Sequence, residues 1–242
     1  MRLRIRFKKY GPVRFIGHLD VMRFFQKAIR RAGIDVAYSK GFSPHQIMAF
    51  AAPLGVGLMS NGEYMDIEVN SMTMSIPSSR GSCTVSCQEI MDRLNQVSVP
   101  GIEVISVKIL PESAGNAMAS VAAAAYTVRF RGESPDFAAI LPDFLGREHI
   151  LIRKETKKGT REVDIRPGIF RLDYRDGALS MLVDASSGGN IKPIQVVEAL
   201  SSERDPGKNH LELLITREDV YTRLETAEGM QFISLDEVGR AG

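Results

Sequence analysis

The first residues of the chain alternate strictly between charged and apolar side chains. Residues 2–7 read Arg-Leu-Arg-Ile-Arg-Phe, which places Leu3, Ile5 and Phe7 on one face of an extended segment. A period of two residues indicates a strand that is covered on one side. After it, residues 17–33 change to helical spacing and end at Gly33, a helix stop signal. The apolar positions at this spacing are Leu19, Met22, Phe25, Ile29 and Ala32.

The rest of the first half continues with extended and helical patterns in turn. Residues 45–52 and 62–69 favour strands, residues 85–97 favour a helix, and residues 102–110 favour a closing strand. The order β-α-β-β-α-β is typical of a ferredoxin-like domain. The pattern therefore predicts such a domain over residues 1–112.

Small side chains dominate residues 113–124, which we interpret as a linker. The second half, 125–218, repeats the order β-α-β-β-α-β with an extra basic hairpin inserted. In it we expect a helix with Ser134 as its N-cap and Pro135 in its first turn, which Pro142 ends or kinks, and a last strand at residues 210–216. We therefore expect an α+β fold of two tandem ferredoxin-like domains, with helices on one face of each antiparallel sheet. The polar residues 219–242 are expected to form a loosely held C-terminal tail.

Composition favours a soluble protein. The chain has 242 residues, of which 44% are hydrophobic and 25% charged, as in ordinary globular domains. No segment approaches the roughly 18 to 20 consecutive apolar residues of a membrane span. The first ten residues lack the apolar core of a signal peptide. We expect a cytoplasmic protein that does not contact a membrane.

The cysteines and the missing motifs exclude several classes of chemistry. The two cysteines, Cys83 and Cys87, have the spacing of the first two ligands of an iron–sulfur loop, but the third ligand position holds Ile90. We expect reduced cysteines and no metal or cofactor held by this chain. The sequence has no P-loop, no G-x-G-x-x-G after a strand, no H-E-x-x-H and no nucleophile elbow.

The positions of the charged residues indicate more about a binding partner than the net charge of +2 does. The first predicted helix carries four cations on one face, with no acid after them before Asp35, and this favours either a solvated face or a polyanion partner. The inserted hairpin at 153–161 is also basic. Its cations would either contact RNA phosphates or keep an exposed sheet edge from pairing with other chains. We expect RNA, without DNA specificity, to bind at Arg14, Arg23, Lys27, Arg30, Arg31, Arg153, Lys154, Lys157, Lys158 and Arg161.

Two further groups of residues have competing explanations. Arg2, Arg4 and Arg6 are expected to form cross-strand ion pairs with Asp66 and Glu68, rather than to bind RNA. If RNA bases stack on this protein, four aromatic residues are the candidates. Most of them are better suited to a position in the hydrophobic core than to base stacking. These aromatic residues are Phe15, Phe24, Phe42 and Tyr64.

Two loops of the first half hold the histidines closest to the basic helix. The segments "GHLD" and "GFSPH" suggest a pocket, and its expected members are His18, Asp20, Gly41, Phe42, Ser43 and His45. His18 or Asp20 would equally serve to cap the helix. Two histidines and a carboxylate also suit metal binding or proton transfer. We favour a binding surface.

Residues 1–110 resemble the bacterial radical-SAM-linked proteins, a family long catalogued as a domain of unknown function. The resemblance is carried by G-P-x-R-F-x-x-H-L-D, R-R-A-G and G-F-S-P-H, and in the second half by "REVDIRPGIFRL" around Asp164, Arg166 and Pro167. It implies a radical SAM protein as partner, which carries an iron–sulfur cluster, SAM and in some cases cobalamin. This chain lacks the three-cysteine cluster motif, so the resemblance implies an accessory or substrate-presenting subunit for RNA modification.

Three hypotheses follow. The first is a non-catalytic RNA-binding subunit of a radical SAM enzyme, acting on tRNA or rRNA. The second is an autonomous RNA-modifying enzyme, similar to tRNA pseudouridine synthases, with Asp20 as nucleophile, although the Arg-Thr-Asp context is replaced by His18-Leu19-Asp20. The third is a protein–protein adaptor whose basic face binds an acidic patch.

Overall fold

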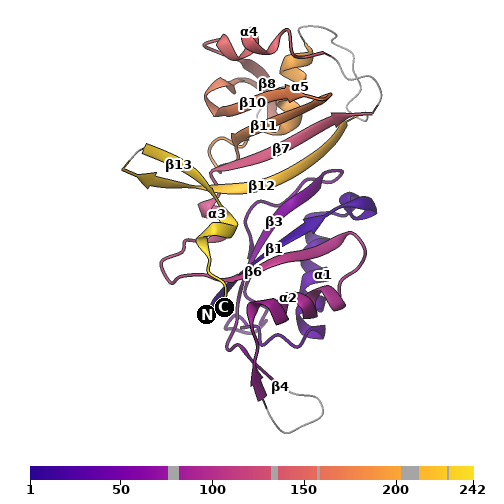
Figure 1. Cartoon of the computed structure of the whole chain (residues 1–242), viewed down its shortest axis with the longest axis vertical. Helices are drawn as coiled ribbons and strands as arrows, with labels where there is room; N and C mark the ends of the chain where they lie inside the picture. Colours follow the sequence, from indigo (N-terminus) through magenta and orange to yellow (C-terminus); the bar gives the residue numbers. More distant parts are fainter. Residues whose placement is uncertain (76–81, 132–135, 157–158, 203–212, 228) are drawn as a thin grey trace. The chain divides into compact units, whose positions relative to one another are not determined.

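The computed structural model describes residues 1–75, 82–131, 136–156, 159–202, 213–227 and 229–242 (Figure 1). The chain divides into two compact units. The first comprises Met1–Val121 and Asp219–Gly242, and the second comprises Ala122–Glu218. The chain therefore leaves the first unit within the expected linker and returns to it at Asp219.

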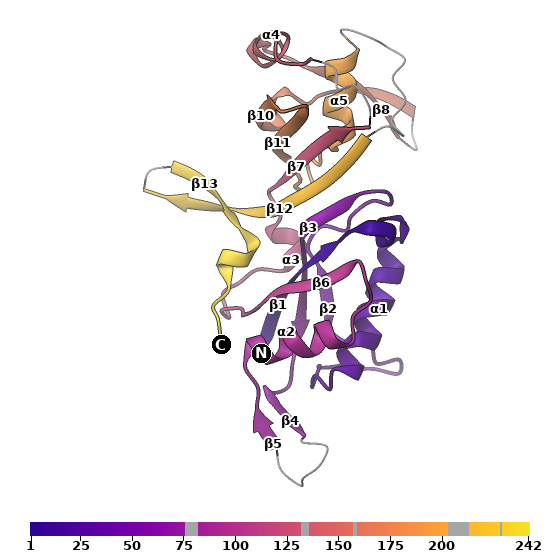
Figure 2. The same ribbon diagram turned by 45° about the vertical axis from the view of Figure 1, so that its right-hand side comes forward.

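The first unit is built on an antiparallel arrangement in which β1 lies between β3 and β6, and β2 pairs with β3. Both α1 and α2 lie on the same face of these strands (Figure 2). β4 and β5 form a separate two-stranded sheet. The elements before the second unit are β1 (Arg2–Lys9), η1 (Gly11–Phe15), α1 (His18–Arg31), β2 (Met48–Phe50), β3 (Met59–Glu68), β4 (Thr73–Ser75), β5 (Ser82–Thr84), α2 (Cys87–Gln96), β6 (Ile102–Ile109) and α3 (Ala117–Ser120).

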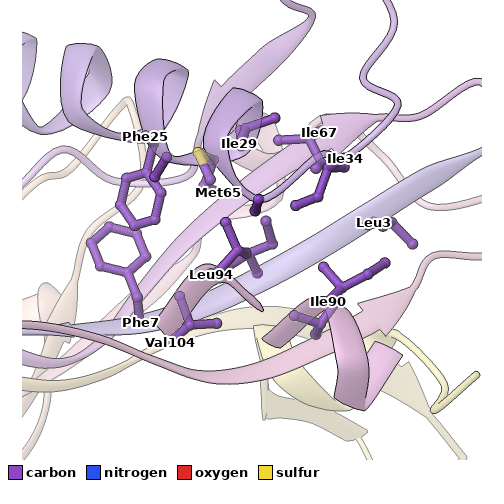
Figure 3. Packing of buried hydrophobic residues seen from close by; sticks show 14 of the residues in the cluster. Leu3, Phe7, Phe25, Ile29, Ile34, Met65, Ile67, Ile90, Leu94 and Val104 are labelled. Carbon is purple, nitrogen blue, oxygen red and sulfur yellow. The ribbon is translucent and has the colours of Figure 1, made fainter. Parts of the chain in front are cut away.

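The core of the first unit confirms the alternation of the first strand. Leu3, Ile5 and Phe7 of β1 are buried beneath the two helices. Figure 3 shows the Phe7 ring against Phe25 of α1, with ring centroids 4.6 Å apart. Apolar side chains from β3, α2 and β6 complete this cluster. Leu19 is the exception on the expected apolar stripe of α1, because its side chain is 60% exposed.

The start of α2 shows why this helix was predictable. Ser86 is the N-cap and accepts from the backbone N–H of Glu89 at 3.2 Å, and the Glu89 carboxylate accepts from the backbone N–H of Ser86 at 2.8 Å. This reciprocal capping box has the local sequence signature S-x-x-E. The expected helix at 85–97 is therefore confirmed, with bounds of Cys87–Gln96.

The second unit contains the antiparallel strands β7, β11 and β10, and β8 with β9 forms a separate hairpin. Its elements are β7 (Ala123–Phe130), α4 (Leu141–Gly146), β8 (Leu151–Thr156), β9 (Gly159–Asp164), η2 (Arg166–Gly168), β10 (Ile169–Arg175), β11 (Ala178–Asp184) and α5 (Pro193–Ser201). β12 (Leu213–Thr226) continues from this unit into the first, and it is followed by β13 (Gly229–Ser234) and η4 (Leu235–Val238).

The prediction for the helix near Pro142 is wrong in its position. The pattern suggested a helix that Pro142 would end, whereas α4 begins at Leu141 with Pro142 in its first turn. A proline has no N–H to donate and has a φ suited to a helix start, so it is well tolerated at the first turn. Ser134 and Pro135, where the helix was expected to begin, lie outside the described residues.

The prediction of two tandem ferredoxin-like domains is wrong. Instead of two separate sheets, the described residues form one nine-stranded sheet with the path β10-β11-β7-β12-β3-β1-β6, while β13 pairs with β12 and β2 with β3. They include five α-helices, of which α3 and α4 have only four and six residues. The physical reason is β12, whose 14 residues extend past the expected end of the second domain.

Residues 219–242 are not a loosely held tail. They include the second part of β12, β13 and η4, and Leu235 of η4 is fully buried. Arg240 forms a bridge with Ile109 of β6 through two backbone hydrogen bonds of 2.9 and 3.0 Å. The polar groups of this segment bind Arg4 and Arg6 of β1 and the Tyr64 hydroxyl of β3, so its low apolar content did not indicate a loosely held tail.

The arginines of β1 show how this segment is held. Arg4 donates to both oxygens of Asp66, at 2.7 and 2.8 Å, and to the Leu235 carbonyl at 3.1 Å. The expected ion pair with Asp66 is therefore confirmed. Arg6 instead pairs with Asp219 at 3.5 Å, and Arg2 donates to backbone carbonyls of residues 111–115 rather than pairing with Glu68.

Candidate nucleic-acid interface

The solvent side of α1 carries the four predicted cations, which we call the basic face: Arg23, Lys27, Arg30 and Arg31. All four are exposed, since residues at i, i+4, i+7 and i+8 share one side of a helix. The only acid within α1 is Asp20, which pairs with Arg23 at 3.4 Å. Both partners are more than half exposed, so this pair is weak. Among the described residues, the Lys27 ammonium has no ion-pair partner.

The next acid along the chain does not neutralise this face. Asp35 accepts from the side-chain amide of Asn70 at 2.8 Å and from the hydroxyl of Ser71 at 3.0 Å. Arg31 points its guanidinium to the Val97 carbonyl at 3.1 Å, which is an uncharged acceptor. The basic face therefore keeps an excess of positive charge.

Residues 38–46 form a short hairpin, which we call the 38–46 hairpin. Tyr38 and Gln46 form a bridge at its base, and the Ser39 N–H donates to the His45 carbonyl at 2.8 Å. Gly41 has a φ of +118°, a conformation that side-chain-bearing residues rarely adopt. Phe42 follows it and is fully exposed, with a relative accessibility of 112%. The hairpin thus presents an aromatic ring to solvent.

A shared acceptor places this hairpin beside the basic face. Gln46 is buried, and its side-chain amide donates to the Gln26 carbonyl of α1 at 3.1 Å. Arg30 donates to the same carbonyl through Nε at 3.2 Å. Phe42 lies four residues from Gln46, so it is at most about 13 Å along the hairpin from this anchor at 3.3 Å per residue. The hairpin that carries the exposed ring is therefore anchored to α1 beside Arg30.

The start of α1 adds a second exposed aromatic ring. In η1, the Arg14 guanidinium lies 4.6 Å from the centroid of the Phe15 ring, which is 62% exposed. The Arg14 carbonyl accepts from the Gly57 N–H at 2.8 Å, and the neighbouring Val56 is also exposed. Leu19, in the first turn of α1, is exposed as well.

The structure gives His18, Asp20 and His45 different partners. The His18 ring makes an edge contact with Phe50 at 4.7 Å, whereas the Nδ1 of His45 lies 2.9 Å from the Ser39 hydroxyl. Asp20 contacts Arg23. No described contact joins two of the three, and capping of α1 by His18 or Asp20 is wrong, because Gly17 is the N-cap without a side-chain bond. Of the expected pocket, Gly41, Phe42, Ser43 and His45 share the exposed hairpin.

The surroundings of His18 shift the pKa of its ring. Burial lowers the pKa of His18 below the ordinary value of 6.5, while Glu63 opposes this shift and Lys9 adds to it. The neutral ring is therefore favoured in the folded protein. In the unfolded chain the ring takes up a proton more readily, so protonation favours unfolding.

We expect His18→Gln to reduce the loss of stability in acid. The contribution of the neutral ring is complete above the unfolded pKa of about 6.5 and is lost as the pH falls through the lower folded pKa. Urea unfolding at about pH 7.5 and about pH 5.5 measures this loss for both proteins. The wild type should lose more free energy of unfolding than the variant, and equal losses would contradict the assignment.

The second predicted basic element is the β8–β9 hairpin of the second unit. Arg153 lies opposite Glu162 and Lys154 opposite Arg161, and both Arg153 and Arg161 are exposed. Lys157 and Lys158, at its predicted tip, lie outside the described residues. Of the five cations predicted to bind RNA in this hairpin, the described ones are Arg153, Lys154 and Arg161.

Asp164, from the segment that resembles the family, organises the end of this hairpin. Its carboxylate accepts from the His149 ring at 2.8 Å and from the backbone N–H groups of Ile150 and Arg166 at 3.0 Å. These three hydrogen bonds lower the pKa of Asp164 to about 2, and the bond from His149 has the largest effect. Arg166 donates to the Leu145 carbonyl at 3.1 Å. Both residues therefore hold the hairpin to neighbouring segments of the second unit.

Several members of this surface were missed or misjudged in the sequence. Most of the four aromatic residues considered were expected to suit a core position better. Tyr64 is fully buried and Phe24 packs partly against the core, whereas Phe15 is exposed, as is Phe42, which was also an expected member of the pocket. Gly41, Ser43 and Pro44 flank Phe42, and this turn composition was the available signal for exposure. No local signal pointed to Gln26 and Gln46, which meet only in the folded chain.

The described residues offer few metal ligands. They contain no group of three or more histidine, cysteine, aspartate or glutamate side chains placed to hold a metal ion. Cys87 is a buried free thiol whose pKa is raised by burial. The side chain of Cys83 lies outside the described residues. Within the described part of the chain, no helix is both long and apolar enough to cross a membrane.

Comparison with known proteins assigns the family. No curated protein matches this chain. Residues 2–193 match the family described as "Uncharacterized protein conserved in bacteria (DUF2344)". The match includes the basic face, the 38–46 hairpin and the β8–β9 hairpin. It spans well over half of the 242 residues, so the chain belongs to the DUF2344 family of bacterial proteins.

Proposed function

We propose that this protein is a non-catalytic RNA-binding subunit that presents tRNA or rRNA to a radical SAM enzyme. The observation that carries the RNA-binding part is the basic face, whose cations are exposed, have one weak acid partner on α1 and lie beside an exposed aromatic ring. Phosphates supply the negative charge that such a face lacks. Aromatic rings supply the stacking surface for bases.

The expected contacts are to the RNA backbone. Arginine and lysine side chains on a convex helix face reach phosphate oxygens, and these contacts position a nucleic acid without reading its sequence. Each phosphate neutralised releases condensed counterions, so affinity falls as salt rises. Arg153, Lys154 and Arg161 of the second unit are proposed to make contacts of the same kind.

The enzyme partner rests on the resemblance to radical-SAM-linked proteins at the Gly17–His18–Leu19–Asp20 and 41–45 segments. In this proposal the partner supplies the iron–sulfur cluster, SAM and, where used, cobalamin, and this chain supplies the RNA-binding surface. The Asp20 carboxylate is exposed and its one ion pair among the described residues is with Arg23, so we assign it no chemical step.

Reversal of two charges on the basic face tests the proposal. We expect the double variant Lys27→Glu, Arg30→Glu to bind bulk tRNA or rRNA fragments at least tenfold more weakly than the wild type. The slope of log affinity against log salt should fall by about 1.4, because each lost phosphate contact contributes about 0.7 on a single strand. Fluorescence anisotropy in rising salt measures both quantities.

A matched control changes the same net charge elsewhere. Arg129 and Arg175 are exposed residues of the second unit, and the double variant Arg129→Glu, Arg175→Glu should bind within about threefold of the wild type. Equal losses in both double variants, or no salt-sensitive RNA binding by the wild type, would contradict the proposal. Enzyme co-purification that persists after nuclease treatment, but is abolished in the α1 variant, would instead assign the basic face to a protein.

A further inference from the structure

We infer that the surface formed by α1 and the 38–46 hairpin binds unpaired RNA, with one base stacked on the ring of Phe42. This inference rests on the proposed function and adds the class of RNA and the residue that selects it. Duplex and single-stranded RNA both carry phosphates, so the basic face alone does not distinguish them. The aromatic ring distinguishes the two, because it offers a stacking surface to unpaired bases.

The first step is the exposure of Phe42. Its ring is fully accessible at the hairpin tip, whereas Phe25 and Phe7 are buried in the core. A buried phenylalanine ring stabilises a fold, whereas the exposed ring of Phe42 contributes no such burial. A ring held in solvent beside cations is suited to stacking on an external aromatic group.

The second step is that the hairpin is held in shape before binding. Ser39 and His45 are joined by three hydrogen bonds, from the Ser39 N–H to the His45 carbonyl, from the His45 N–H to the Ser39 hydroxyl, and between that hydroxyl and the His45 ring. The Gln46 side chain ties the base of the hairpin to α1. A fixed loop loses less conformational entropy on binding, so more of the stacking energy appears as affinity.

The third step is the order in which the cations and aromatic rings follow one another along α1. The cations of α1 extend from Arg23 to Arg31, about 12 Å at 1.5 Å per residue. The Arg14–Phe15 pair lies before the helix start, and the 38–46 hairpin is anchored beside Arg30. A strand whose phosphates follow these cations can therefore present bases to a ring. Paired bases already stack on one another inside a duplex, and only unpaired bases are free to stack on a side chain.

The absence of tryptophan from the sequence allows a direct test. In the variant Phe42→Trp the new indole is the only one in the chain, and a base stacked on it changes its fluorescence. We expect a saturable, salt-sensitive fluorescence change with a single-stranded RNA of about 12 nucleotides and a much smaller one with the blunt duplex of the same sequence. Phe170 is an exposed aromatic residue of β10, so Phe170→Trp is the matched control and should show no change.

The corresponding affinities separate stacking from charge. We expect Phe42→Ala to bind the single strand about fivefold to a hundredfold more weakly, a range set by the measured contribution of base–aromatic stacking. Phe42→Tyr should retain wild-type affinity, and Phe42→Ala should leave the salt slope unchanged because no phosphate contact is lost.

Three outcomes would overturn the inference in distinguishable ways. If Phe42→Ala binds single strand and duplex as the wild type does, while the Lys27→Glu, Arg30→Glu variant is impaired, stacking is excluded and the proposed RNA binding stands. If the wild type binds neither RNA, both the inference and the proposed RNA binding fail. Loss of a protein partner in Phe42→Ala without any loss of RNA affinity also overturns the inference.

Discussion

The variant Asp66→Ala is expected to lower the free energy of unfolding by about 3–5 kcal/mol, because it leaves an arginine buried without its counter-charge. The side chains of Arg4 and Asp66 are 1% and 8% exposed and are joined by two hydrogen bonds of 2.7 and 2.8 Å. Arg4 also donates to the Leu235 carbonyl at 3.1 Å. Loss of the carboxylate therefore also weakens the position of η4. Urea unfolding measures the change.

Two controls make this expectation specific to the buried charge. Asp20→Ala removes the carboxylate of the exposed Arg23 pair and should change the free energy of unfolding by at most about 1 kcal/mol. The double variant Arg4→Met, Asp66→Leu removes both charges and should recover most of the lost stability. If the double variant is as unstable as Asp66→Ala, the buried unpaired charge is not the cause.

The variant Phe25→Ala is expected to cost about 3–5 kcal/mol in unfolding free energy, since it removes a fully buried ring from the core of the first unit. Phe25 lies 4.6 Å from Phe7, 5.1 Å from Phe24 and 6.3 Å from Phe50 between ring centroids. Phe7 and Phe25 are both visible in Figure 3. No other side chain can fill the space without moving these neighbours.

Phe42→Ala is the matched comparison, because it makes the same change at a fully exposed position. Its effect on unfolding free energy should stay within about 0.5 kcal/mol. The two variants should therefore show opposite behaviour, with Phe25→Ala affecting stability and Phe42→Ala affecting RNA affinity. A large loss of stability in Phe42→Ala would mean that its ring packs against the protein, and would remove the basis for stacking.

Local patterns in the sequence predicted the elements of the first unit well. The alternation of Leu3, Ile5 and Phe7 identified a half-covered strand, and the helical pattern at 85–97 identified α2, whose start carries the S-x-x-E signature of a capping box. These signals work because side-chain direction and helix capping depend on residues two to four positions apart. The spacing of the four cations on α1 is a property of the same kind.

The same reasoning failed where a segment depends on distant partners. Leu19 fits the apolar stripe of α1 and is nevertheless exposed, and residues 219–242 look polar and are nevertheless ordered. Asp219 accepts from the Tyr64 hydroxyl and from the Ser234 hydroxyl and pairs with Arg6. Polar segments of this kind are stabilised by specific partners rather than by apolar burial, so hydrophobic periodicity does not detect them.

The features of the candidate surface also fall into two groups, those predicted from local sequence patterns and those that depend on contacts between distant residues. Residue patterns alone predicted the four cations on one helix face, the turn residues around Phe42 and the pairing of Arg4 with Asp66. Contacts made in the folded chain were needed to show that Asp35 accepts from Asn70 and Ser71, and that Gln46 anchors the hairpin beside Arg30. The same holds for the sheet path through β12. Periodicity records which side of an element is buried, whereas the partner on that side is chosen by contacts between residues far apart in the chain.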